Sequence, residues 1–343
     1  MPLRRPQILW ILAAINGLLF AIVALSLEKM TTVDQQVYGL MAGMASPFAT
    51  GFWNLCTLLG NWIVLVILCF TMVFCLPLKE YRAPLLLNMM LSVLLNLTLK
   101  SFFARYRPTE VTLMVVEAGY SFPSGHTMAA ACFFGFLILL TQRCGLSKAI
   151  KWLLSALLAL VILLVGASRI YLGAHFFSDV MGGLLCSAAY LCIFSAFIER
   201  FFGEEDHTFL PPLPHRNRFM ASFSFAFEGI AASLKAERNM VVHLGIMTLV
   251  VVFAALLGLT MVEWMICILL FAMVLMAELI NTAIETLVDM VSPQVDPRAK
   301  LAKDTAAGAV LVVSIASAII GALIFVPKLL AVIGSGLTIH GAL

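Results

Sequence analysis

Apolar runs long enough to cross a membrane recur from one end of this sequence to the other. A spanning helix needs about 17–25 mostly apolar residues, because the hydrocarbon core of a bilayer is about 30 Å thick. Such runs lie at residues 8–27, 55–76, 84–103, 125–142, 151–171, 176–198, 240–258, 262–288 and 305–327. Only 11% of the residues are charged, whereas soluble domains carry about 25%. The sequence therefore predicts an all-α integral membrane protein with nine spans.

The distribution of basic residues predicts the orientation of these spans. If the N-terminus is cytoplasmic, most of the 21 Lys and Arg residues fall on the cytoplasmic side, as the positive-inside rule describes. The first run follows Arg4 and Arg5 but lacks a small-residue cleavage site, so we expect an uncleaved anchor. We expect a multi-pass protein with a cytoplasmic N-terminus. The eight cysteines form no CxxC pair, which argues against a disulfide framework or a zinc site.

A charged, Pro-rich segment at 199–218 interrupts the apolar runs and indicates a cytoplasmic linker. Residues 217–238 follow it with helical periodicity and basic residues at both ends, which is typical of a helix lying in the membrane surface. We expect a first domain at 1–200, a linker at 201–215 and a second domain at 216–343. The first would be a six-span bundle, and the second a surface amphipathic helix followed by a three-span bundle.

Three polar clusters lie at the predicted outer ends of spans in the first domain. They are Lys100 with Arg107-Pro108, then Pro123-Ser124-Gly125-His126, then Ser168-Arg169 with His175 and Asp179. Charged side chains at mid-membrane cost about 2.5 kcal/mol or more each, so such groups pair or mark a polar site. Three cations that converge there can hold phosphate oxygens and neutralise transition-state charge. The clusters therefore predict phosphoryl transfer that uses no metal.

The remaining residues of these clusters suit three tasks: binding an anion, acting as nucleophile and acting as general acid. Ser124 and Gly125 open a helix whose free N–H groups favour an anion. His175 and Asp179 are four residues apart, which predicts one helical face and a carboxylate that orients the imidazole as a nucleophile. His126 is then free to protonate the leaving oxygen. Singly, each cluster also fits a helix cap, a structural hydrogen bond or a cation that reaches the interface. The three together favour a site.

The motifs "KSFFARYRP", "PSGH" and "SRIYLGAHFFSD" resemble, in order and in spacing, the three signatures of the type-2 phosphatidic acid phosphatase family of membrane lipid phosphatases. The resemblance covers roughly residues 1–200. It implies a phosphohistidine on His175, with His126 as general acid and Asp179 as the residue that orients His175. It also implies phosphate-binding roles for Lys100, Arg107, Ser124, Gly125 and Arg169. The motifs do not distinguish undecaprenyl diphosphate, phosphatidylglycerophosphate and phosphatidic acid as substrates.

A second polar stripe lies in the predicted span 262–288, where Glu278, Asn281, Glu285 and Asp289 share one helical face. Glu237 precedes the seventh span on the same cytoplasmic side, and "RAKLAKD" leads into the ninth. Carboxylates suit Mg²⁺ with nucleotide phosphates, and a deep carboxylate can take a proton from a lipid hydroxyl. A polar helix–helix seam is the structural alternative.

The stretches "ASLKAERNMVVHLG", "AELINTAIETLVD" and "AKLAKDTAAGAVL" resemble the prokaryotic diacylglycerol kinase/undecaprenol kinase family over about 216–330. The resemblance implies Glu278 as general base, with Glu237 and Glu285 holding Mg²⁺. It implies an ATP site that is shaped by Arg218, Asn281, Asp296, Lys303 and Asp304. It also implies a homotrimer in which each active site is built between subunits.

The two expected sites lie on opposite sides of the membrane, so one product can reconcile a phosphatase with a kinase. Both removal of one phosphate from undecaprenyl diphosphate outside and phosphorylation of undecaprenol inside give undecaprenyl phosphate. We therefore expect a bifunctional enzyme of the bacterial inner (cytoplasmic) membrane that supplies this carrier lipid for peptidoglycan synthesis. The alternative is a glycerolipid enzyme that combines a phosphatidic acid or phosphatidylglycerophosphate phosphatase with a diacylglycerol kinase. A third possibility is a membrane protein with degenerate sites, which the intact motifs disfavour.

Overall fold

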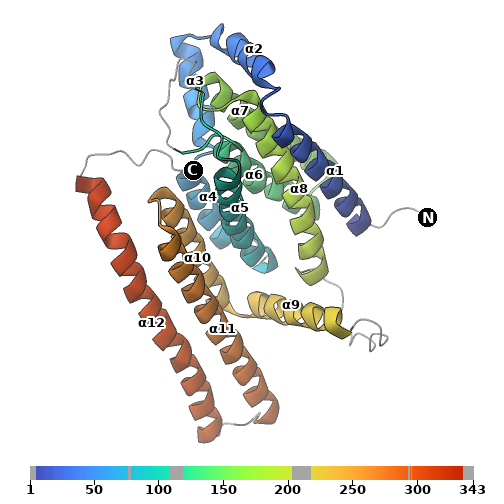
Figure 1. Ribbon diagram of the computed structural model, residues 1–343. Helices are drawn as coiled ribbons and strands as arrows, with labels where there is room; N and C mark the ends of the chain where they lie inside the picture. Colours follow the sequence, from blue (N-terminus) through green and yellow to red (C-terminus); the bar gives the residue numbers. More distant parts are fainter. Residues whose placement is uncertain are drawn as a thin grey trace. The chain divides into compact units, whose positions relative to one another are not determined.

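The computed structural model describes residues 5–75, 79–108, 119–202, 218–292, 294 and 296–334 (Figure 1). The elements in this part of the chain are helices, which confirms the all-α prediction. The chain forms two compact units that divide near Glu199 and Arg200, and a short segment, Leu78–Ala83, belongs to the second unit.

The first unit contains the eight helices that precede the linker. They are α1 (Arg5–Leu25), α2 (Thr31–Ala42), α3 (Pro47–Leu58), α4 (Trp62–Cys75), α5 (Arg82–Phe103), α6 (Gly125–Arg143), α7 (Lys148–Tyr171) and α8 (Phe177–Phe202). A one-turn 3₁₀ helix, η1 (Lys79–Tyr81), lies between α4 and α5. The first ten residues of α6 are buried, so α6 forms the centre of this unit. Its N-terminal end carries the "PSGH" motif into the core.

Eight of the described helices are long and apolar enough to span a membrane, or nine if the bent pair α3–α4 counts as one span. The expected run 55–76 is not one straight helix, because α3 and α4 meet at a bend of 49°. A Cβ on Gly60, in this break, would lie 2.5 Å from the Val165 side chain and 3.0 Å from the His126 carbonyl oxygen. Glycine therefore lets the broken span approach α6 and α7 closely.

Helix α2 is an element that the apolar pattern did not predict. It joins the first span to the bent pair, and its sequence "TTVDQQVYGLMA" is too polar and too short to cross a bilayer. One charged residue, Asp34, is nevertheless 1% exposed. A buried carboxylate needs partners, so this helix is held against the unit by polar contacts.

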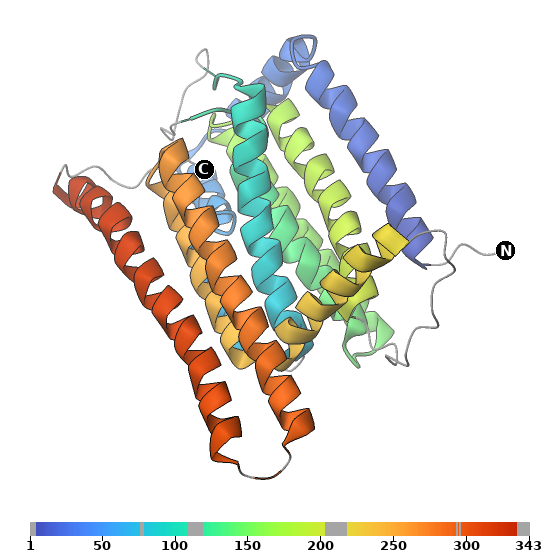
Figure 2. The same ribbon diagram turned by 60° about the horizontal axis from the view of Figure 1, so that its bottom comes forward.

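The second unit contains α9 (Arg218–Ala236), α10 (Arg238–Leu256), α11 (Met261–Val291) and α12 (Pro297–Gly334). In Figure 2, α11 and α12 run side by side as a long hairpin and α9 crosses near one end of α10. A capping box between Thr260 and Glu263 begins α11. Helix α12 starts earlier than the apolar run 305–327, because "RAKLAKD" continues the helix beyond its apolar part.

Candidate functional sites

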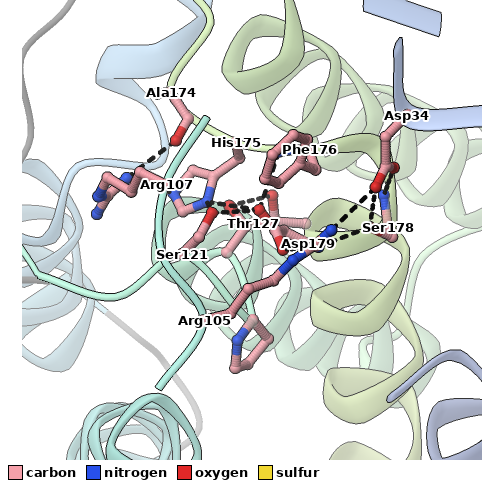
Figure 3. A network of polar contacts seen from close by, with 12 residues as sticks. Asp34, Arg105, Arg107, Ser121, Thr127, Ala174, His175, Phe176, Ser178 and Asp179 are labelled. Carbon is pink, nitrogen blue, oxygen red and sulfur yellow. Dashed lines mark hydrogen bonds and ion pairs between the residues drawn. The ribbon is translucent and has the colours of Figure 1, made fainter. Parts of the chain in front are cut away.

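The nucleophile expected in the first unit, His175, lies beside the carboxylate expected to orient it. The His175 Nδ1 atom is 3.4 Å from Asp179 Oδ2, and both side chains are fully buried. The Ser121 hydroxyl donates a hydrogen bond to Asp179 Oδ2 and lies 3.3 Å from His175 Nδ1 (Figure 3). The backbone N–H of Phe176 donates to the same carboxylate oxygen at 2.9 Å.

One expectation about this pair is wrong. His175 does not share a helical face with Asp179, because α8 begins only at Phe177 and His175 lies in the turn before it. Gly173, with φ of +73°, makes that turn possible. The backbone N–H of His175 donates to the Arg169 carbonyl oxygen at 3.2 Å. The turn between α7 and α8, rather than helical periodicity, therefore places the imidazole.

Arg107 lies on the other side of the imidazole and fixes its tautomer. Its Nη1 atom is 3.3 Å from His175 Nε2 and 3.0 Å from the Ala174 carbonyl oxygen, and its Nε donates to Gly119 at 3.1 Å. A guanidinium donates hydrogen bonds and accepts none, so Nε2 must present its lone pair to Arg107. The proton then lies on Nδ1, which faces Ser121 and Asp179. Nε2 is then the ring nitrogen that carries the lone pair, as the expected role of nucleophile requires.

The "PSGH" motif occupies the start of α6. Ser124 is the N-cap residue and Gly125 is the first helical residue, as the sequence predicted. The Ser124 side chain caps no backbone N–H but accepts a hydrogen bond from the Thr127 hydroxyl at 3.0 Å. Its backbone N–H donates to the Asp179 carbonyl oxygen at 3.1 Å. His126, 8% exposed, follows in the first turn of α6.

The two remaining cations of the motifs are buried in the same unit. Lys100 lies in the last turn of α5 and is 4% exposed, and Arg169 near the end of α7 is 1% exposed. The Arg169 Nη1 atom donates to the Thr57 hydroxyl on α3 at 2.7 Å. Their roles in binding phosphate stay predictions.

Four residues of this region were not singled out from the sequence: Asp34, Arg105, Ser121 and Ser178. Arg105 donates to Asp179 Oδ1 at 2.6 Å and to Asp34 Oδ2 at 3.1 Å. Asp34 also accepts hydrogen bonds from Ser178. Arg105 and Ser178 lie inside quoted motifs and Ser121 lies two residues before "PSGH", which was the available signal. Asp34 lies on a helix without any motif, so no local pattern indicates its contacts.

In the second unit, the expected general base Glu278 is 3% exposed and pairs with a histidine from the neighbouring helix. His243 Nε2 on α10 lies 2.8 Å from Glu278 Oε1 on α11. The sequence analysis missed His243, although a lone histidine inside the apolar run 240–258 was a usable signal. The pair gives a deeply placed carboxylate a polar partner within the helix bundle.

The rest of the predicted polar stripe follows along α11. The Asn281 side-chain amide donates to Glu285 Oε1 at 3.1 Å. Further along the helix, Asp289 forms an ion pair with Lys303 of α12 at 2.5 Å. These contacts bring the acidic stripe and the basic start of α12 together, as the sequence predicted.

The other expected residues lie around the start of α10 and α12. Glu237 is the half-buried N-cap residue of α10, and Asp304 is exposed on α12. Asp296 accepts the backbone N–H of Arg298 at 2.8 Å. The side chain of Arg218 lies outside the described residues. Within the described part of the chain, no group of three or more His, Cys, Asp and Glu side chains could hold a metal ion.

An apolar cavity of about 360 Å³ lies between α10, α11 and α12, with His243 at its edge. Ser314 and Ser317 of α12 also line it, and their buried hydroxyl oxygens have no hydrogen-bond partner among the described residues. A mostly apolar pocket with a few polar groups is the usual form of a small-molecule site.

The first and second halves of the chain match different families of known proteins. Residues 82–202 match the PAP2 superfamily. A lipid A 4'-phosphatase from Porphyromonas gingivalis is 30% identical over 172 residues, 46% of this chain and 70% of that protein. A crystal structure of a transmembrane PAP2-type phosphatidylglycerolphosphate phosphatase from Bacillus subtilis aligns with a TM-score of 0.51 and 26% identity. That alignment covers 55% of this chain and 96% of the solved chain.

Residues 224–325 match the family described as prokaryotic diacylglycerol kinase. An undecaprenol kinase from Bacillus subtilis is 46% identical over 113 residues, which are 33% of this chain and 92% of that protein. The two matched segments do not overlap, and each contains one of the two sites described above. The chain belongs to the PAP2 superfamily through its first half and to the prokaryotic diacylglycerol kinase family through its second, and it is a membrane lipid phosphatase fused to an ATP-using lipid kinase.

Proposed function

We propose that the two halves supply one product, undecaprenyl phosphate. The phosphatase would remove the terminal phosphate of undecaprenyl diphosphate at the outer face, and the kinase would phosphorylate undecaprenol at the cytoplasmic face. The 46% identity to an undecaprenol kinase supports the kinase substrate. A shared product also explains why one chain would carry both activities. The two reactions would otherwise oppose each other.

The observation that carries the phosphatase half is the orientation of His175 between Arg107 and Asp179. In the proposed reaction, Nε2 attacks the terminal phosphorus and forms a phosphohistidine, while His126 protonates the departing lipid-phosphate oxygen. Asp179 stabilises the positive charge that develops on the imidazole. Arg107 exchanges its contact with Nε2 for the phosphate oxygens, and Lys100 and Arg169 supply further positive charge. Water then hydrolyses the phosphohistidine, which releases inorganic phosphate.

The position of the polar stripe along α11 supports the proposed lipid kinase activity. Helix α11 has 31 residues, about 46 Å at 1.5 Å per residue, whereas about 20 residues cross the hydrocarbon core. Counted from Met261, twenty residues end near Asn281, so Glu278 would lie near the boundary of the hydrocarbon core, where a lipid hydroxyl is expected. Glu285 and Asp289 then extend toward water and ATP. Glu278 would accept the hydroxyl proton as the lipid oxygen attacks the γ-phosphorus.

The kinase site offers oxygen donors that suit a divalent cation. Magnesium is usually held by one or two carboxylates together with substrate phosphates, and Glu285 and Glu237 are the residues that would hold it. Bound Mg²⁺ would offset the charge of the ATP phosphates. Lys303, which pairs with Asp289 in this structure, would turn to those phosphates. A trimer would let a neighbouring subunit complete this site.

The connection between the halves supports placing the sites on opposite faces. His175 lies just before α8, and Glu237 lies just before α10. Of the described helices between them, α8, with 26 residues, is long and apolar enough to span a membrane, so the chain would cross the membrane once. The site of the first unit would therefore face away from the ATP supply if the N-terminus of the chain is cytoplasmic.

A glycerolipid function is the second candidate, and specific relatives favour it. A phosphatidylglycerophosphatase B from Bacillus subtilis is 42% identical over 92 residues, although the match spans only 44% of that protein. In this alternative, the outer site would act on phosphatidylglycerophosphate or phosphatidic acid. The inner site would act on diacylglycerol.

Purified full-length protein in mixed micelles tests the proposal. It is given undecaprenyl diphosphate or phosphatidylglycerophosphate, and separately undecaprenol or diacylglycerol with Mg-ATP. We expect His175→Ala to abolish phosphate release alone and Glu278→Ala to abolish lipid phosphorylation alone. A higher kcat/KM for both glycerolipids would replace the undecaprenyl assignment. Loss of both activities from either substitution would contradict independent sites.

A further inference from the structure

Among motif residues to which the sequence assigned no role, Arg105 and Ser178 form a buried polar cluster with Asp34 beside Asp179. Arg105 Nη1 donates to Asp179 Oδ1 at 2.6 Å and to the Ser178 hydroxyl at 2.8 Å. Its other terminal nitrogen, Nη2, donates to Asp34 Oδ2 at 3.1 Å. Figure 3 shows Arg105 reaching between the two carboxylates. One guanidinium thus joins α2 to the start of α8.

Arg105 and Arg107 have different tasks although they are two residues apart. Ala104, with φ of +46°, ends α5, and the chain then runs as a non-helical segment. Arg107 reaches the nucleophilic nitrogen of His175, whereas Arg105 reaches the carboxylate that faces the opposite ring nitrogen. Arg105 also lies 4.3 Å above the Phe176 ring, which restricts its side chain. Its position is therefore behind the imidazole and away from Nε2.

Asp34 accepts the hydrogen bond from the second terminal nitrogen of Arg105. Its Oδ1 accepts the backbone N–H of Ser178 at 2.8 Å, and its Oδ2 accepts the Ser178 hydroxyl at 2.7 Å. That backbone N–H lies in the first turn of α8 and has no acceptor within the helix, so Asp34 takes the place of a helix cap. The carboxylate therefore fixes both Arg105 and the helix start that carries Asp179.

The charges of the cluster also match the reaction. When both carboxylates are ionised, Asp34 and Asp179 contribute two negative charges and Arg105 contributes one positive charge. With a neutral imidazole, these groups leave one negative charge, which offsets the positive charge that His175 gains when Nε2 bonds to phosphorus. Without Arg105, two buried carboxylates would repel each other and Asp179 would lose the donor to its Oδ1.

We propose that Asp34, Arg105 and Ser178 form a positioning clamp that holds Asp179 in the orientation required by the His175 nucleophile. The inference rests on the proposed role of His175. It assigns Arg105 to the carboxylate rather than to phosphate, although Arg105 lies within a phosphate-binding motif. It also gives α2 a part in the phosphatase site.

The test compares Asp34→Asn and Arg105→Gln with Arg107→Gln in the full-length protein. For the two clamp variants we expect the rate of phosphohistidine formation and kcat to fall about 10- to 100-fold, as misplacement of a catalytic group does. We expect KM and the inhibition constant of inorganic phosphate to stay within about twofold, because no phosphate contact is lost. Arg107→Gln should instead weaken inhibition by phosphate. Glu28→Gln, which changes an exposed carboxylate six residues before Asp34, is the matched control and should change nothing.

Further variants keep the test decisive. The double variant Asp34→Asn/Arg105→Gln should lose much less than the product of the two single losses, since the residues act as one unit. Asp34→Glu should recover part of kcat. If Asp34→Asn fails to fold, Ser178→Ala removes one hydroxyl and should still lower kcat with KM unchanged. An unchanged kcat in the folded clamp variants, or weaker phosphate inhibition in them, would overturn the clamp. Full activity of His175→Ala would instead contradict the proposed function itself.

Discussion

At the scale of single residues, the buried charges of both sites are held by specific partners. Asp179 has Arg105 and Ser121, Asp34 has Ser178, and Glu278 has His243. A carboxylate removed from water is strongly destabilising when its partner is lost. Pairing therefore lets the two sites keep reactive carboxylates inside an apolar protein.

The pair between His243 and Glu278 gives a prediction at this scale. His243→Leu should lower kinase kcat and reduce the free energy of unfolding by about 1–3 kcal/mol, because the Glu278 carboxylate loses a buried donor. His243→Gln, which keeps an N–H donor at similar reach, should recover much of both. Lipid phosphorylation and thermal unfolding measure the effects, and phosphatase turnover serves as the control. Wild-type kinase activity in His243→Leu would show that the contact is dispensable.

At the scale of elements, close packing brings the start of α6 against α8. A Cβ on Gly182 would lie 2.4 Å from the ring of Phe122. Phe122 is fully buried, stacks on Phe20 and meets the Phe103 ring edge to face, so it has no space to move. The residues on either side of Phe122 are Ser121 and the start of the "PSGH" motif. Glycine on α8 thus sets the distance between two parts of the site.

Gly182→Ala should therefore lower phosphatase kcat and destabilise the first unit by about 1–3 kcal/mol, the usual cost of overpacking. Gly135→Ala is the matched control, because its Cβ would meet only the flexible end of Leu191 at 2.5 Å. Phosphate release and thermal unfolding would be compared for the two variants. Equal effects of both substitutions would argue against a special role of the Phe122 contact.

At the scale of the whole molecule, the proposed function requires the two sites to face opposite sides of the membrane. Met44, between α2 and α3, is 55% exposed, and Lys300 at the start of α12 is also exposed. With exposed Cys75 replaced by serine, Met44→Cys should react with a membrane-impermeant maleimide on intact spheroplasts. Lys300→Cys should react only after lysis. Labelling of both positions from the same side would contradict the proposed topology.

The proposed trimer predicts that defective subunits can complement each other. If each kinase site takes Glu278 from one subunit and Glu237 from the next, co-assembly of Glu237→Ala with Glu278→Ala should restore about a quarter of wild-type kinase activity by random mixing. Each variant alone should be inactive. Inactivity of the mixed, co-purified trimers would instead place both carboxylates of a site in one subunit.

The sequence by itself determined the all-helical membrane class, the two families and the motif residues, because apolar run length and motif spacing are local properties of the chain. Tertiary structure decided which partners those residues have. Asp34 and Ser178 are 144 positions apart, Arg105 and Asp179 are 74 apart, and His243 meets Glu278 from a different helix. The four-residue spacing of His175 and Asp179 wrongly predicted that both lie on one helix, although α8 begins two residues after His175. A spacing pattern does not detect the turn at Gly173. Contacts between distant segments depend on how helices pack, and no local pattern encodes that packing.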